Sequence, residues 1–373
     1  MLPRGSMQRP QLKRETSPGF PRPRGLNHSP IQASPNRSPL LKNALDMRKR
    51  SLTPERSVSP SLVMSRGNEF DWETGEGGGR PNHSASLARN QGENPAKSLQ
   101  ISPVIKDYLL LEEIGQGSFG KVFKAEYLPT KTPVAVKVYP KSTLTRTREA
   151  SIKNEINILV NLDHPNIVKF IDCFSNKEHI FIVMELLEGE NLYKSFKKGL
   201  ADFAVDFSRP EARQRFAGVV MTQLSSALLY LHERFINHRD VKLDNIAFDS
   251  KTAQIKLIDF GFSKVVSPYV PERLYCGTPS YMAPEALRKE ECNTLSVDIW
   301  AAGVVYYTLL FGKFPFRGST DIELFENIMT KKLFFPEWLE ESEVHVLKKC
   351  LDKRPNNRVT AAELYRLMKY NQY

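Results

Sequence analysis

Alternating polar and apolar residues mark the first regular elements well inside the chain. Residues 121–127 carry apolar side chains at every second position, which predicts a β-strand. Residues 133–139 predict a second strand after a turn around Pro129. The apolar run Ile180–Met184 predicts a third, buried strand. The first two strands, joined by a short turn, predict a hairpin.

Helical spacing follows the hairpin. Residues 148–162 place Ile152, Ile156 and Leu159 on one side, which predicts an amphipathic helix. The longest apolar run, Ile299–Phe311, has 13 residues. That is short of the ~18 residues that a bilayer requires. We therefore expect a buried core helix there and no membrane span.

The first 106 residues lack both patterns. They hold only 3 of the 37 aromatic residues, but 13 of the 25 prolines and 9 of the 20 glycines. Such a segment cannot bury enough apolar surface to offset its conformational entropy. We expect residues 1–106 to form a disordered Ser/Pro-rich basic tail, and residues 107–373 to fold.

Charge divides at the same place. Of the formal net charge of +11, the tail carries +9 and the rest only +2. Six Ser-Pro pairs and one Thr-Pro pair make the tail a predicted target of proline-directed kinases. Because few aromatic residues lie among the basic ones, we expect no sequence-specific binding of nucleic acid.

The cysteines bear on location. Cys173, Cys276, Cys292 and Cys350 lie far apart with no CxxC spacing, which argues against a disulfide framework or a zinc site. The first 30 residues contain no apolar stretch typical of a secretory signal. We expect a monomeric protein in a reducing compartment, cytoplasmic or nuclear.

A glycine-rich turn joins the start of the folded part to the strand at 121–127. The same Gly-x-Gly-x-x-Gly motif also occurs in dinucleotide-binding sites, but in those sites a helix follows the glycines. Here a strand follows, and glycines let backbone N–H groups approach phosphate oxygens. We expect a nucleotide's phosphates beneath the turn, which reads Ile114, Gly115, Gln116, Gly117, Ser118, Phe119, Gly120, Lys121 and Val122.

Lys137 lies on an otherwise apolar strand, where a buried charge needs a partner. Glu155, beside the apolar stripe of the predicted helix, can reach the ammonium and hold it against phosphates. Two alternatives stay open: Lys137 faces solvent, or another acid such as Glu149 takes the role.

Three more motifs follow in order. Residues 238–245 read HRDVKLDN, residues 259–261 read DFG and residues 283–285 read APE. Together with the glycine turn and Lys137, they make the chain from about Tyr108 onward resemble the eukaryotic protein kinase superfamily. The subgroup is open, with the calmodulin-dependent kinases among the similar ones.

The resemblance implies an α+β, protein-kinase-like fold of two lobes. A small antiparallel β lobe with one key helix would span about residues 107–186, and a large, mainly helical lobe about residues 190–373. It implies an ATP- and Mg²⁺-dependent kinase that transfers the γ-phosphate to Ser/Thr hydroxyls of protein substrates.

The resemblance also implies catalytic roles. Asp240 would accept the proton of the substrate hydroxyl, and Lys242 would steady the γ-phosphate. Asn245 and Asp259 would give oxygen ligands to Mg²⁺. Thr278 would bond Asp240 and Lys242 and, with Lys242, favours Ser/Thr over Tyr acceptors.

Substrate preference is less determined. Asp244 and Glu190 would favour basic residues in the substrate, although a solvated acidic face explains both equally well.

The strand ending at Met184 would lead into the hinge between the lobes. Met184 would guard the adenine pocket, and Ala247 is smaller than the aliphatic residue usual at its floor. Beyond the glycine turn and Lys137, the implied nucleotide-binding residues are Ala135, Glu155, Met184, Glu185, Leu187, Asn191 and Ala247.

Activation departs from the common pattern. Arg239 would pair with a phosphate on the activation segment, but the usual acceptor position is Leu274, which has no hydroxyl. Either Ser267, Tyr269 or Tyr275 substitutes as the acceptor, or Glu272 supplies the negative charge permanently. We expect basal activity without that phosphate. The resemblance also implies that His238 packs on Phe260 beneath the catalytic loop.

Two further expectations concern support for the large lobe. Asp298 would hold the backbone of the catalytic loop, and Glu285 and Arg358 would form a buried ion pair.

Two other readings of the whole chain remain. A pseudokinase could act as a scaffold that binds partners through its tail, although the intact Lys137, Asp240, Asn245 and Asp259 argue against it. Small-molecule kinases share the architecture but usually lack the segment at residues 277–285.

Overall fold

The computed structural model describes residues 101–370, except 117–119, 199–206, 268–269 and 275–276. The predicted tail up to residue 100, Gly117, Ser118 and Phe119 of the glycine turn, and the candidate acceptors Tyr269 and Tyr275 lie outside the described residues. In the part of the chain that the structure describes, no helix is long and apolar enough to cross a membrane.

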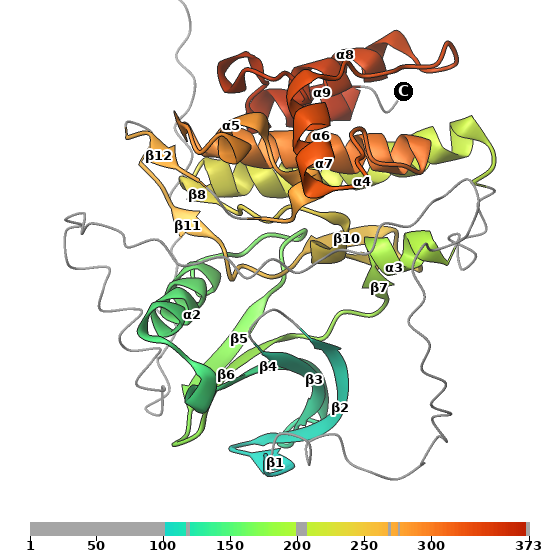
Figure 1. Cartoon of the computed structure of the whole chain (residues 1–373). Coiled ribbons are helices and arrows are strands. Elements are labelled where there is room, and N and C mark those ends of the chain that lie inside the picture. The colour runs from blue at the N-terminus through green and yellow to red at the C-terminus, as the bar shows by residue number, and fades with distance from the viewer. Residues whose placement is uncertain (1–100, 117–119, 199–206, 268–269, 275–276, 371–373) are drawn as a thin grey trace, which may run out of the picture. The chain divides into compact units, whose positions relative to one another are not determined.

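A six-stranded antiparallel sheet forms the first half of the fold, in the order β1-β2-β3-β4-β6-β5 (Figure 1). Its strands are β1 (Val104–Ile105), β2 (Tyr108–Gln116), β3 (Lys121–Tyr127), β4 (Thr132–Pro140), β5 (Phe170–Ser175) and β6 (His179–Glu185). The predicted strands at 121–127 and 133–139 match β3 and β4, which pair antiparallel as the predicted hairpin.

The two faces of β4 have different neighbours because side chains alternate along a strand. Val134, Val136 and Val138 belong to an apolar cluster on one face of the sheet. Tyr139, two residues beyond Lys137, belongs to a second cluster that continues into the helical part. The alternation therefore directs Lys137 and Tyr139 to the same face.

Helix α2 (Arg146–Leu159) lies against that face of the sheet (Figure 1). Its buried Ile152 and Ile156 join the cluster that holds Tyr139. The helix begins two residues before the predicted residue 148, because the Thr145 side chain accepts from Arg148 N and caps the first turn.

Helices dominate the second half of the fold. They are α3 (Leu192–Lys197), α4 (Pro210–His232), α5 (Pro284–Leu287), α6 (Leu295–Phe311), α7 (Asp321–Thr330), α8 (Glu341–Cys350) and α9 (Ala361–Tyr370). Helix α6 is buried from Val297 to Leu310, which confirms the predicted core helix, and it packs against α4.

Short strands and turns of 3₁₀ helix connect the longer elements. The strands are β7 (Glu190–Asn191), β8 (Ile236–Asn237), β9 (Ile246–Asp249), β10 (Gln254–Leu257), β11 (Lys264–Val265), β12 (Glu272–Arg273) and β13 (Glu291–Cys292). The 3₁₀ turns are η3 (Lys141–Thr143), η4 (Leu243–Asn245), η5 (Pro279–Tyr281) and η6 (Pro355–Asn357).

The start of the folded part differs from the prediction. Ile101 and Ile105 are buried in the sheet's first cluster, and β1 pairs with β2. The predicted boundary after residue 106 is therefore wrong, because Ile101 and Ile105 belong to the folded part. A two-residue strand carries no periodicity, so the local pattern could not reveal it.

Candidate active site

Lys137 of β4 lies between two carboxylates from distant parts of the chain. Its Nζ is 2.9 Å from Glu155 Oε1 and 2.8 Å from Asp259 Oδ1. The predicted partnership of Lys137 with Glu155 is therefore confirmed as a contact. Lys137 and Glu155 are both buried, so the solvent-facing alternative for Lys137 is wrong.

The electrostatics of this group keep it charged. Burial alone would lower the pKa of Lys137, but the carboxylates of Asp259 and Glu155 raise it well above its usual value. Burial alone would raise the pKa of Asp259, but Lys137 and the backbone N–H of Gly261 lower it to about 2. Asp259 also has φ of 60°, a conformation that is rare outside glycine.

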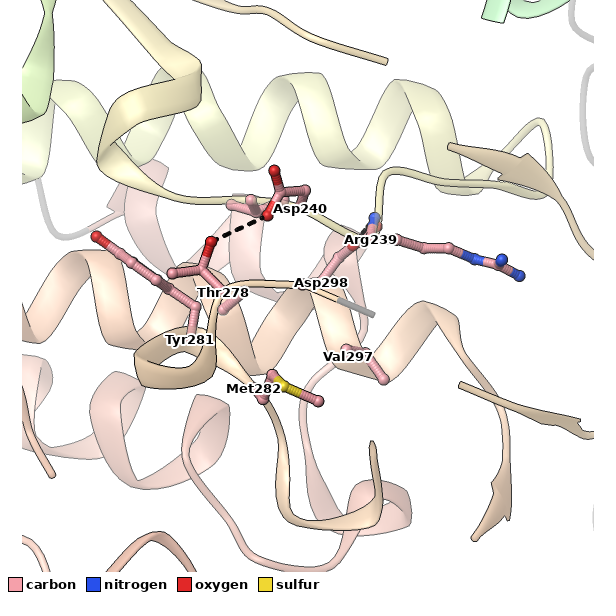
Figure 2. A pocket seen from close by; sticks show the side chains of 10 residues that line it. Arg239, Asp240, Thr278, Tyr281, Met282, Val297 and Asp298 are labelled. Carbon is pink, nitrogen blue, oxygen red and sulfur yellow. Dashed lines mark hydrogen bonds between the residues drawn. The ribbon is translucent and has the colours of Figure 1, made fainter. Parts of the chain in front are cut away.

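A second group gathers around Asp240, just after β8. Lys242 Nζ lies 2.9 Å from Asp240 Oδ2 and donates to Thr278 Oγ1 at 2.9 Å. The Thr278 hydroxyl in turn donates to Asp240 Oδ1 at 3.5 Å. Figure 2 shows the Thr278 hydroxyl facing the Asp240 carboxylate at the edge of a small cavity, which Tyr281 and Met282 also line. The predicted contacts of Thr278 are confirmed.

Asp298 supports this loop from α6. Its two carboxylate oxygens accept from His238 N at 2.9 Å and Arg239 N at 2.8 Å, as predicted. The His238 ring meets Phe260 edge-on, with centroids 4.9 Å apart, which confirms that predicted contact too. Burial lowers the pKa of His238, so its ring stays neutral and serves as a packing group.

Two oxygen donors are available to a divalent metal. Asn245 Nδ2 donates to the backbone oxygen and to Oδ2 of Asp240, each at 2.8 Å, which leaves the Asn245 amide oxygen for another partner. Asp259 supplies an ionised carboxylate. Within the described ranges, no group of three or more His, Cys, Asp or Glu side chains could hold a metal alone. The pair therefore fits a hard metal that takes its other ligands from phosphate and water.

The residues expected around the nucleotide lie on neighbouring strands. Ala135 pairs in register with Met184, and Val122 with Lys137. Position 120 requires a glycine because the backbone of β4 approaches it closely. A Cβ there would lie 2.4 Å from the Val138 backbone oxygen.

Two other residues expected to contact the nucleotide, Glu185 and Asn191, already use their side chains in contacts within the protein. The Glu185 carboxylate binds Lys256 at 2.8 Å and the Lys169 N–H at 2.7 Å. Only the backbone of Glu185 is thus left for the nucleotide. The Asn191 amide oxygen accepts from Lys194 N and caps α3, so only its Nδ2 remains for the nucleotide. Asn191 lies beside Ala247 in the β7–β9 pair.

Glu272 binds two cations in the activation segment. Arg239 Nη2 donates to Glu272 Oε2 at 2.8 Å, and Lys264 Nζ lies 2.8 Å from Glu272 Oε1. Leu274, at the expected phosphate position, is buried in the core. Glu272 therefore pairs with the arginine that the resemblance assigned to a phosphate.

Of the two acids expected to attract a basic substrate, Glu190 pairs with a lysine and Asp244 lies near two lysines. Glu190 Oε1 lies 2.8 Å from Lys198 Nζ. Burial raises the pKa of Asp244, against the opposing effect of Lys242 and Lys197. A preference for basic residues gains no support from these contacts.

Three residues of this region were not found from the sequence. Tyr139 donates to Glu155, Lys264 binds Glu272, and Asn154 Nδ2 donates to the Ser263 backbone oxygen at 2.6 Å. The alternation along β4 could have indicated Tyr139, because it follows Lys137 by two positions. The other two contacts join segments far apart in sequence and left no local signal.

A family model and the curated relatives agree on the family that this chain resembles. The sequence model of the protein kinase domain matches residues 108–368. Myosin light chain kinase A of Dictyostelium discoideum is 37% identical over 64% of this chain and 77% of its own length. CBL-interacting protein kinase 12 of Oryza sativa subsp. japonica is 32% identical over 70% of this chain and 47% of its own length. CBL-interacting serine/threonine-protein kinase 15 of Arabidopsis thaliana is 33% identical over 67% and 58%, so the chain spans about half the length of these plant relatives.

Proposed function

Because the chain belongs to the protein kinase family, we propose that it transfers the γ-phosphate of ATP to Ser or Thr hydroxyls of protein substrates, with Mg²⁺ as the metal. The observation that carries the proposal is that Asn245 links two groups of side chains, because its Nδ2 donates to Asp240 and its backbone oxygen accepts from Ile258 N, next to Asp259. One group is Lys137 with Glu155 and Asp259, and the other surrounds Asp240.

Phosphoryl transfer depends mainly on positioning and on neutralising charge. Lys137, held by Glu155, presents an ammonium to the nucleotide's phosphates. Asn245 and Asp259 present oxygen atoms to Mg²⁺, which neutralises phosphate charge when bound. This chain's own residues thus supply both the cation and the metal ligands.

At the acceptor, Asp240 takes the proton of the substrate hydroxyl and orients its oxygen. Lys242 balances the negative charge beside Asp240. Thr278 bonds to both and fixes their spacing at one end of the segment that would support the substrate. Because Lys242 and Thr278 are features of the Ser/Thr class, the proposal extends to that class of acceptor.

The proposal stops at the acceptor class. The relatives' names mention different partners, CBL in the plant proteins and myosin light chain in the Dictyostelium protein. The monomeric state, the cytoplasmic or nuclear location and the phosphorylation of the tail by proline-directed kinases are proposed on the sequence alone. The scaffold alternative has no observation in its favour, and the contacts of Lys137 with Glu155 and of Thr278 with Asp240 and Lys242 support the enzyme.

A peptide-library phosphorylation assay with ATP and Mg²⁺ tests the proposal. We expect phosphate on Ser/Thr peptides with wild type, none with Asp240→Ala, and wild-type activity with Asp321→Ala, an exposed aspartate at the start of α7. Omission of the metal should abolish transfer. Nucleotide binding without transfer by wild type would contradict the enzyme and favour the scaffold.

A further inference from the structure

Tyr139 is the buried tyrosine next to the phosphate-facing lysine. It lies on β4 two residues after Lys137, on the same face of the sheet, and only 1% of its surface is exposed. A buried tyrosine requires a hydrogen-bond partner for its hydroxyl. The partner here is Glu155, to whose Oε2 the hydroxyl donates at 2.8 Å.

The two oxygens of Glu155 are thus held by two residues of one strand. Lys137 holds Oε1 at 2.9 Å and Tyr139 holds Oε2 at 2.8 Å. The last torsion of a glutamate has broad, weak preferences, so one donor alone leaves the carboxylate free to turn. Two donors fix its plane, and hydrogen bonds to a charged acceptor are the stronger kind.

The ring of Tyr139 also contacts the end of the glycine turn. A Cβ added to Gly120 would lie 3.0 Å from Tyr139 Cδ1 and 3.3 Å from Cε1, so the glycine lies close against one edge of the ring. Lys137 Nζ is 5.4 Å from the ring centroid, within the range of a cation–π contact. One side chain therefore touches the turn, the lysine and the glutamate.

We propose that Tyr139 is a positioning residue for nucleotide binding. Its hydroxyl keeps Glu155 in the orientation that holds Lys137 ready for the phosphates, and keeps α2 against the sheet. This inference rests on the proposed function, which assigns Lys137 to the phosphates.

Two measurements on the full chain test it. The first is the dissociation constant of Mg²⁺-ATP for Tyr139→Phe, which removes only the hydroxyl. We expect affinity to fall about tenfold, as for a lost hydrogen bond to a charged group. The second is hydrogen exchange of α2 amides without nucleotide, which we expect to become about tenfold faster as the helix loses its tie to the sheet.

Tyr306→Phe is the matched control. Tyr306 is also buried and also donates to a glutamate, Glu343 Oε1, at 3.4 Å, but it lies on α6 away from the candidate active site. We expect this variant to keep wild-type affinity for Mg²⁺-ATP and wild-type exchange in α2.

A double-mutant cycle separates positioning from general stabilisation. With Glu155→Ala in the background, the hydroxyl has lost its partner, so Tyr139→Phe should cause no further loss of affinity. Additive losses would overturn the inference, as would wild-type affinity and α2 exchange in Tyr139→Phe. Faster exchange that extends equally into α6 would also overturn it, because it would show a general loss of packing.

The outcomes distinguish this inference from the proposed function. A chain that transfers no phosphate but shows the expected exchange and binding changes contradicts the proposed function alone. A chain that transfers phosphate and is insensitive to Tyr139→Phe contradicts this inference alone.

Discussion

Arg239, the residue before the proposed catalytic base, donates to Glu272 Oε2 at 2.8 Å. A glutamate side chain thus neutralises the arginine, with no phosphate needed for that purpose. Lys264 binds the same carboxylate. Without that negative charge, the guanidinium and the ammonium would repel each other across the activation segment. The ion cluster thus joins the catalytic loop to β11 and β12 without any covalent modification.

We expect Glu272→Gln to lower kcat about tenfold, equal to about 1.4 kcal/mol of transition-state stabilisation. That loss lies near the low end for hydrogen bonds to charged groups. Peptide phosphorylation assays measure it. Glu291→Gln, which removes an exposed carboxylate of the adjacent β13, should have wild-type kcat. Phosphatase treatment of wild type should leave its activity intact; if it abolishes activity, a phosphate and not Glu272 is required.

We expect Lys137→Met to reduce phosphate transfer at least about 100-fold. The substitution leaves two carboxylates, Glu155 and Asp259, facing the same space without their shared cation, which is costly inside a protein. Lys153→Met is the control, because Lys153 is exposed on the same helix as Glu155 and pairs with Glu149. Transfer within about threefold of wild type in Lys137→Met would contradict the assigned role.

The buried pair of Arg358 and Glu285 governs stability. Two hydrogen bonds of 2.6 and 2.7 Å join them, and at most 1% of either side chain is exposed. We expect Arg358→Met to lower the free energy of unfolding by about 3–5 kcal/mol, because Glu285 is left buried and unpaired. Urea denaturation measures the change. Arg354→Met, whose arginine side chain is 78% exposed, should change it by less than about 1 kcal/mol.

Stability should also fall below neutral pH. Burial lowers the pKa of His164, His179 and His238 in the folded chain. The unfolded chain accepts these protons near pH 6.5, while the folded chain resists them. The free energy of unfolding is therefore highest above about pH 6.5. It decreases as the pH falls from 6.5 toward the lowered pKa values of these histidines in the folded chain.

Denaturation at pH 7.5 and 5.5 checks this dependence. We expect His238→Asn to reduce the difference between the two free energies, whatever its effect at pH 7.5. His345→Asn, at an exposed histidine, should retain the wild-type difference. An unchanged difference in His238→Asn would exclude His238 as a contributor.

Local patterns predicted the elements whose residues interact mainly with sequence neighbours. The alternation at 121–127 and the apolar run in α6 carry their own periodicity, so their positions could be predicted. That Lys137 has an acidic partner could be predicted because a buried charge demands one, but the fold was needed to choose Glu155 over Glu149. The roles around Asp240 came from motif resemblance, not from periodicity.

Contacts between distant segments could not be predicted in this way. Nothing in the sequence around Lys264 distinguishes it from an ordinary surface lysine. Only the folded chain brings it to Glu272. The Asn191 cap also escaped notice, since the resemblance suggested a nucleotide contact while the start of α3 uses the side chain. Long-range geometry decides the Lys264 contact, whereas the Asn191 cap is local, because Asn191 accepts from Lys194 N only three residues away.

The short strand β1 bears on how the domain can be cut out for study. The charge division suggests a domain start at residue 107, and the family match suggests one at residue 108. A fragment that starts at either residue would lack Ile101 and Ile105. Each buried isoleucine contributes about 1.5–3 kcal/mol, and their loss would open the apolar interior of the sheet beside Tyr108 and Leu110. A soluble catalytic fragment should therefore begin before Ile101.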